Sequence, residues 1–108
     1  MVSLITGGAG FIGSHLADRL VREGERVVVL DDLSTGTLLN IEQLLPSPLF
    51  RFVEGSVLDG ELVADLVGGA DTVFHLAAAV GVRRILDEPL ASIATNVDGT
   101  ANVLRAAQ

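Results

Sequence analysis

The fold of this chain is decided by residues 2–13, Val2-Ser3-Leu4-Ile5-Thr6-Gly7-Gly8-Ala9-Gly10-Phe11-Ile12-Gly13. Residues 2–6 are typical of a short buried strand, and the glycines follow it at once. Apolar residues at positions 12, 16, 17, 20 and 21 then recur at helical spacing, and Gly24 lies where that helix is expected to end. The stretch therefore predicts a strand, a glycine-rich turn and a helix.

Three glycines of the turn have separate expected purposes. Gly7 lets the chain turn tightly, Gly10 lets the main chain come close to a diphosphate, and Gly13 lets the helix pack against the strand. Main-chain amides at the positive end of the helix would then face the phosphates. A Walker-type loop is excluded because no Lys-Ser or Lys-Thr follows. The alternative is an ordinary strand-to-helix turn with fortuitous glycines.

The alternation of strand and helix continues to the end of the chain. Further strands are expected at residues 26–30, 49–53 and 72–76, and helices at 38–45, 59–67 and 89–107. Right-handed crossovers place four such strands in the order 3-2-1-4. The expected fold is an α/β Rossmann-type doubly wound parallel sheet. Residues 1–108 are expected to form its N-terminal half, as one truncated NAD(P)-binding domain.

Charge and composition argue against several partners. The net charge is −7, and the seven basic residues are arginines, of which only Arg83 and Arg84 are adjacent. Nucleic acids and anionic membrane surfaces both attract a basic patch, so neither is an expected partner. No apolar run approaches the roughly 18 residues of a membrane span, and the absence of cysteine removes thiolate metal sites. A cytoplasmic protein without a metal is expected.

An acidic residue follows the second expected strand at the distance that a dinucleotide site requires. Asp31 lies 18 residues past Gly13, where a carboxylate accepts hydrogen bonds from the adenosine ribose hydroxyls. That carboxylate would repel a 2′-phosphate, and no arginine occurs between Asp31 and Arg51 to bind one. The pattern favours NAD as cofactor. The alternative is a solvated turn with a helix cap, because Asp is common in turns.

The string from Thr6 to Leu16, Thr6-Gly7-Gly8-Ala9-Gly10-Phe11-Ile12-Gly13-Ser14-His15-Leu16, resembles the extended short-chain dehydrogenase/reductase family. Its members are NAD-dependent nucleotide-sugar epimerases and dehydratases of the UDP-glucose 4-epimerase type. Residues 31–36, 73–79 and 89–100 are similar to later motifs of the family, so the resemblance covers essentially the whole chain. It implies cofactor-binding roles for Gly7, Gly10, Phe11, Ile12, Gly13, Asp31, Asp32, Ser34, Thr35, Gly36, Ser56, Val57, Leu76, Ala77, Ala78 and Asn96.

Two positions depart from the family pattern at the adenosine end of the expected site. The family often has Asn where this chain has Asp32, and usually has Asp where it has Ser56. The family carboxylate contacts the adenine amine, so Ser56 is expected to bind the base more weakly. The added charge of Asp32 is expected to alter the phosphate side of the site. Asp59 is interpreted as a helix N-cap rather than a ligand.

Four further polar residues have more than one interpretation. His75 lies in an apolar strand without a matched carboxylate, which favours a hydrogen-bonded structural histidine over a catalytic one. In the family, an Asn in mid-helix supports the active site, and Asn96 matches it; an exposed helical Asn is the alternative. Arg83 and Arg84 face phosphate, a partner subunit or solvent, and in an acidic chain we favour solvent.

The catalytic groups of the family are missing from these 108 residues. The family uses a Tyr-x-x-x-Lys pair with a Ser or Thr, and this chain contains neither tyrosine nor lysine. The chain is therefore expected to be the NAD-binding portion of an epimerase or dehydratase that acts on a nucleotide sugar, and to be inactive alone. A homodimer through the last helix is also implied. The alternative is a catalytically silent NAD-binding or sensing module.

Overall fold

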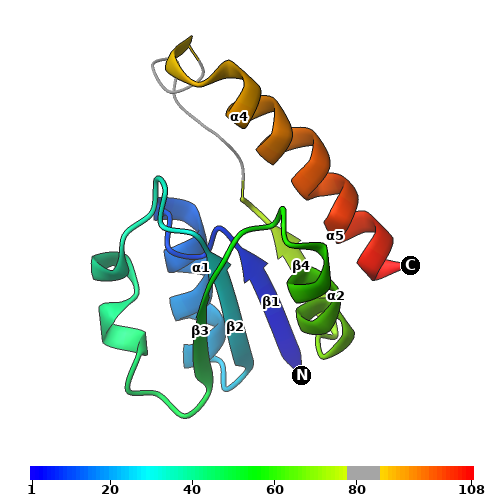
Figure 1. Cartoon of the computed structure of the whole chain (residues 1–108). Helices are drawn as coiled ribbons and strands as arrows, with labels where there is room; N and C mark the ends of the chain where they lie inside the picture. Colours follow the sequence, from blue (N-terminus) through cyan, green and yellow to red (C-terminus); the bar gives the residue numbers. More distant parts are fainter. Residues whose placement is uncertain (78–85) are drawn as a thin grey trace.

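A four-stranded parallel sheet forms the centre of the computed structural model, which describes residues 1–77 and 86–108 (Figure 1). The strands are β1 Val2–Thr6, β2 Arg26–Asp31, β3 Phe50–Glu54 and β4 Thr72–His75. They lie in the order β3-β2-β1-β4, so the expected order 3-2-1-4 is confirmed. Within the sheet, Leu4 of β1 is beside Val28 of β2 and Val73 of β4.

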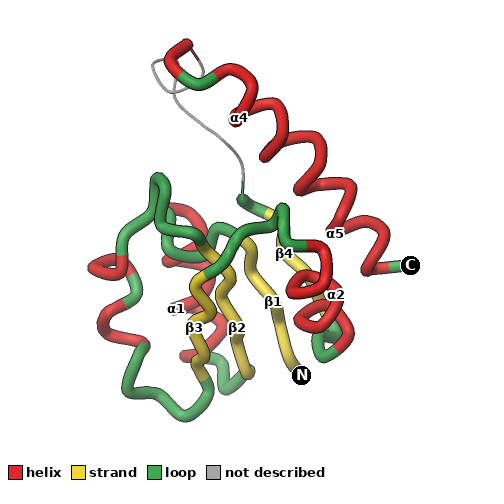
Figure 2. The backbone as a smooth tube through the Cα atoms, viewed as in Figure 1, coloured by secondary structure: helices red, strands yellow, loops and turns green. Residues whose placement is uncertain are grey.

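Helices cover both faces of this sheet (Figure 2). The covering helices are α1 Phe11–Arg22, α2 Gly60–Gly68 and α5 Thr100–Ala107. Helix α4 Pro89–Ile93 and the π-helical segment Ala94–Gly99 lead into α5, and α4 extends past the sheet (Figure 1). Helix α1 packs on one face, while α2 and α5 pack against each other on the opposite face. None of the helices in the described ranges is long and apolar enough to cross a membrane.

Two apolar cores result because neighbouring strand residues point to opposite faces. Ile5 belongs to the core beneath α1, and Leu4 belongs to the core beneath α2 and α5; both are fully buried. Fully buried strands suit a parallel sheet that is covered on both faces. Burial of β1 from both sides holds its carboxyl end, and the glycine turn that follows, in a fixed position.

The structure differs from the expected helices in two places. The helix expected at 38–45 is instead two short 3₁₀ turns, Leu38–Asn40 and Glu42–Leu44. Thr37 accepts a hydrogen bond from the Leu39 amide, and Asn40 donates its side-chain amide to the Ala9 carbonyl, which favours local turns over a continuous helix. The helix expected at 89–107 is present, but residues 94–99 widen into π-helix.

Candidate cofactor site

The candidate site is a groove at the carboxyl ends of the strands. One part has a volume of about 290 Å³ and is lined by Gly7, Gly10, Phe11, Ile12, Gly13, Asp31, Thr35, Leu76 and Ala77. An adjoining part is lined by Leu30, Asp31, Asp32, Ser34, Thr35, Gly55, Val57, Ala77 and Thr95. The two parts share Asp31, Thr35 and Ala77 and thus form one groove. Ligands of open parallel sheets bind at this edge, where the strand order reverses.

Gly7 and Gly13 of the turn are required by the fold itself. Gly7 has a φ of +72°, and a Cβ there would lie 2.8 Å from the Ala77 main-chain nitrogen. Its own amide donates a 2.7 Å hydrogen bond to the Leu30 carbonyl. A Cβ at Gly13 would lie only 2.5 Å from the Gly7 carbonyl oxygen, so α1 can begin this close to the turn only without a side chain.

Gly10 differs from Gly7 and Gly13 because the protein leaves room around it. Its φ of −77° and ψ of 177° are accessible to any residue. A Cβ there would meet only the Gly7 carbonyl oxygen, at 3.3 Å, among the described atoms outside its chain neighbours. Its backbone lines the groove. The absence of a side chain at Gly10 therefore favours access to the groove more than it favours folding.

The first turn of α1 presents main-chain amides without a competing side chain. No side chain caps the helix at Gly10 within the described part of the chain, and its first turn contains no acidic residue. The leading amides of a helix have no intrahelical acceptor, and this end carries partial positive charge. Phe11, Ile12 and Gly13 are at these positions and line the groove. This arrangement is suited to an anion such as a diphosphate.

Asp31 connects the end of β2 to the glycine turn. Its side chain is buried, with Oδ2 accepting from the Ala9 amide at 3.0 Å and Oδ1 accepting from the Leu33 amide at 2.8 Å. A carboxylate has roughly four acceptor positions, so each oxygen retains capacity for a second donor. Asp31 borders both parts of the groove and can accept from a ligand hydroxyl while it holds the turn.

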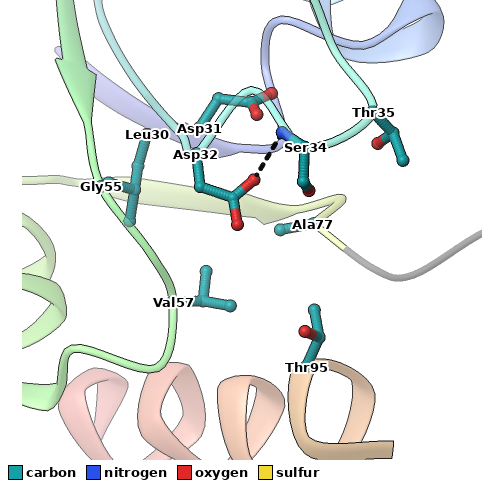
Figure 3. Close-up of a pocket in the computed structure, with 9 residues that line it drawn as sticks. All are labelled: Leu30, Asp31, Asp32, Ser34, Thr35, Gly55, Val57, Ala77 and Thr95. Atoms are coloured by element: carbon teal, nitrogen blue, oxygen red, sulfur yellow. Dashed lines mark hydrogen bonds between the residues drawn. The ribbon is translucent and has the colours of Figure 1, made fainter. Parts of the chain in front are cut away.

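Asp32 occupies the adjoining part of the groove in a different way (Figure 3). Its side chain is exposed, and Oδ1 accepts a 2.9 Å hydrogen bond from the Ser34 amide. Leu33, between the two acids, has a φ of 62°, an unusual value for a leucine. Asp31 and Asp32 thus each accept a hydrogen bond from the amide two residues ahead, and the backbone turns at Leu33. Figure 3 shows the Asp32 carboxylate directed into the space between Val57 and Thr95.

A directed chain of hydrogen bonds supports the segment after β4. Thr100 donates to the Asn96 carbonyl at 2.7 Å and therefore accepts from His75 Nε2 at 3.1 Å. His75 Nδ1 then accepts from the Thr6 hydroxyl at 2.6 Å, and Thr6 accepts from the amides of Leu76 and Ala77. The chain requires a neutral imidazole, and burial lowers the His75 pKa. His75 is thus hydrogen-bonded, as the sequence predicted.

Most of the predicted cofactor residues come together along the groove. These are Gly7, Gly10, Phe11, Ile12, Gly13, Asp31, Asp32, Ser34, Thr35, Val57, Leu76 and Ala77. Gly36 is not among the lining residues; a Cβ there would lie 2.8 Å from the Ala9 carbonyl oxygen and 3.0 Å from Asp31 Oδ2, and its predicted cofactor role stays a prediction. Ala78 falls outside the described residues, as do Arg83 and Arg84.

The other two predicted residues do not line the groove. Ser56 accepts a 3.0 Å hydrogen bond from the Leu58 amide. Asn96 is exposed in the π-helical segment, where its neighbour Thr95 lines the groove. The predicted cofactor roles of Ser56 and Asn96 therefore stay predictions.

Several residues at or under the site have no role that the sequence predicts. Leu30, Gly55 and Thr95 line it, while Thr6, Asn40 and Thr100 hold its main chain through hydrogen bonds. The cap assigned to Asp59 is confirmed, since its side chain accepts from the Leu62 amide. Asn40 reaches the glycine turn, and Thr95 lines the groove with Asp32, only in the folded chain. Neither position therefore carries a local sequence signal.

A parallel sheet in this order, with a glycine turn that leads into an uncapped helix, defines a Rossmann-type fold of the class that binds dinucleotides. Residues 4–108 match the model of a family described as GDP-mannose 4,6 dehydratase. The chain belongs to this family, within the extended short-chain dehydrogenase/reductases that include NAD-dependent nucleotide-sugar epimerases and dehydratases.

Similar proteins catalyse different reactions. A UDP-N-acetyl-alpha-D-glucosaminuronate decarboxylase from Bacillus cytotoxicus is 44% identical over 96% of this chain and 32% of its own length. A UDP-glucose 4-epimerase from Mycolicibacterium smegmatis is 42% identical over 100% of this chain and 35% of its own length. A dTDP-glucose 4,6-dehydratase from Streptomyces venezuelae, solved with NAD and TYD bound, superimposes with a TM-score of 0.92 at 37% identity, over 99% of this chain and 35% of that one. The chain thus spans about a third of the length of these relatives.

Proposed function

We propose that this chain binds NAD in the groove and forms the cofactor-binding portion of a nucleotide-sugar epimerase or dehydratase. The observation that carries the proposal is the open face of Gly10 beside the uncapped amides of α1. Helix starts of this kind favour phosphate groups because amide donors and the helix dipole act together. Family membership supports the same cofactor and class of reaction.

The groove offers a different environment for each part of a dinucleotide. The amides of Phe11, Ile12 and Gly13 would hold the diphosphate, and Asp31 would accept from the adenosine ribose hydroxyls. Leu76 and Ala77 would form the floor near the nicotinamide ribose. Bound NAD supplies a hydride acceptor, which the family uses for transient oxidation of a sugar carbon.

We propose that residues 1–108 bind cofactor without turnover. Proton transfer at a sugar hydroxyl needs a positioned acid–base group, and the family's Tyr-x-x-x-Lys pair is missing from the sequence. His75 does not substitute for that pair, because both ring nitrogens are engaged with threonine hydroxyls. Catalytic groups and the nucleotide-sugar pocket would belong to further residues of the parent enzyme.

A homodimer of the parent enzyme, in the cytoplasm, is the remaining part of the proposal. Apolar side chains on the last helical stretch are largely exposed at helical spacing, namely Leu90, Ile93, Val97 and Leu104. Such a stripe is suited to a helix from a second subunit. Light scattering on the parent enzyme should give twice the monomer mass, and a monomeric mass would remove this part of the proposal.

Titration calorimetry with NAD and NADP tests the cofactor assignment. NAD should bind at least about tenfold more tightly, a difference of roughly 1.4 kcal/mol, because a 2′-phosphate would lie against the Asp31 carboxylate. Asp31→Ser is expected to reduce this preference, whereas Asp71→Ser, at the opposite edge of the sheet, should not change it. Equal affinity of the unaltered chain for both dinucleotides would contradict the role given to Asp31.

A further inference from the structure

The adenosine end of the groove contains one carboxylate oxygen without a protein donor. Both oxygens of Asp31 accept main-chain amides, from Ala9 and Leu33. In Asp32, Oδ1 accepts from the Ser34 amide, whereas Oδ2 has no hydrogen-bond donor or cation within the described parts of the chain. Asp32 Oδ2 is therefore the strongest available acceptor at this end.

The walls around Asp32 suit a flat ring with a donor at its edge. Leu30, Gly55, Val57 and Ala77 supply apolar or side-chain-free surface, and Thr95 closes the side formed by the last helical stretch (Figure 3). Ser56 does not line this space, and its hydroxyl oxygen already accepts from the Leu58 amide. An exocyclic amino group is the donor that an adenine ring presents at its edge.

From this arrangement we infer that Asp32 determines base specificity by accepting a hydrogen bond from the 6-amino group of adenine. This inference rests on the proposed NAD site, and it gives Asp32 the recognition that the family resemblance implies for position 56. An ionised acceptor forms stronger hydrogen bonds than a hydroxyl does. The chain would thus recognise the base with an acid from the loop after β2 rather than from the loop after β3.

The assignment makes an opposite prediction for a cofactor that carries an acceptor at the same position. Deamino-NAD has hypoxanthine in place of adenine, with a carbonyl where adenine has the amino group. This carbonyl would face Asp32 Oδ2, and two acceptors repel each other. In Asp32→Asn, Oδ1 can remain on the Ser34 amide, so that Nδ2 faces the groove as a donor. The preference should then reverse toward deamino-NAD.

Titration calorimetry with NAD and deamino-NAD tests the inference on the unaltered chain first. NAD should bind at least about tenfold more tightly than deamino-NAD, and Asp32→Asn should abolish or reverse this preference. Ser56→Ala is the matched control and should keep the ratio within about twofold. Circular dichroism establishes that each variant is folded.

The outcomes separate this inference from the proposed function. If the unaltered chain binds both dinucleotides equally, Asp32 does not recognise the amino group, while the NAD site still stands. The inference is also overturned if Ser56→Ala removes the preference, or if Asp32→Asn weakens both dinucleotides by the same factor, which would indicate a contact to the ribose. Failure of both dinucleotides to bind would instead overturn the proposed function.

Discussion

The two ends of the groove are built from different parts of the chain. The phosphate end consists of main-chain groups, which Gly7 and Gly13 bring together and Gly10 leaves accessible. The end that we propose for adenosine is lined by polar side chains, chiefly Asp31 at the end of β2 and Asp32 in the loop after it. Steric constraint fixes the first end, whereas the direction of two carboxylate side chains shapes the second end. The two ends should respond differently to substitution.

Gly7→Ala is expected to give the largest effect, and the effect is on folding. A left-handed alanine costs roughly 1–2 kcal/mol, and the Cβ would press on the Ala77 main chain, so about 2–5 kcal/mol of unfolding free energy should be lost. Urea unfolding measures this loss. Gly68→Ala is the control, because nothing lies within 4 Å of its Cβ position. Equal stability of the two variants would show that the turn tolerates a side chain.

The neighbouring acids Asp31 and Asp32 provide a matched comparison at the adenosine end. Asp31→Ala leaves two amides without their acceptor and should cost about 2–3 kcal/mol of unfolding free energy. Asp32→Ala removes one exposed turn hydrogen bond and should cost less than about 1 kcal/mol. The same urea experiment compares them. A similar loss in both variants would mean that Asp31 does not connect β2 to the glycine turn.

Asn40→Ala should produce a smaller effect at the phosphate end. Its side-chain amide donates a 2.8 Å hydrogen bond to the Ala9 carbonyl, which also accepts from the Thr37 amide. Because Ala9 keeps one donor, a loss of about 1 kcal/mol is expected, together with a weaker hold on the glycine turn. Gln43→Ala, which loses only a 3.3 Å bond at an exposed position, is the control. A loss no greater than that of the control would remove Asn40 from the support of the turn.

The smallest predicted effect is a pH dependence of stability from His75. Burial lowers its pKa below the ordinary 6.5, so the unfolded chain binds a proton more readily than the folded chain. The free energy of unfolding should therefore decrease as the pH falls from about 7.5 to about 5.5. Urea unfolding across this range measures the slope, and His75→Asn should flatten it. An unchanged slope in the variant would assign the pH dependence to other groups.

Much of the fold could be predicted because its signals are local. Residues 2–6 and 26–30 are apolar with little interruption, and the glycine turn opens a helix at once, which indicates a parallel sheet and its strand order. The two 3₁₀ turns between residues 38 and 44 were not predicted. They depend on Asn40 reaching Ala9, a contact between segments 31 positions apart.

The candidate site could be predicted at its phosphate end better than at its adenosine end. Glycine spacing reports a steric requirement directly, and the structure shows that requirement at Gly7 and Gly13. The direction of a side chain depends on turns that the sequence does not specify. Ser56 accepts from its own loop, and the π-helical segment brings Thr95, rather than Asn96, to the groove.

The NAD affinity of Gly10→Val, measured together with its stability, is the most direct test of diphosphate binding at the glycine turn. The backbone at Gly10 accepts any residue, and its Cβ meets only one described protein atom beyond its neighbours, at 3.3 Å, so the variant should stay folded and lose no more than about 2 kcal/mol, part of it from the poorer N-cap preference of valine. Its added side chain should nevertheless block the diphosphate and weaken NAD binding at least about tenfold. A folded Gly10→Val chain that binds NAD as tightly as the unaltered chain would contradict the account.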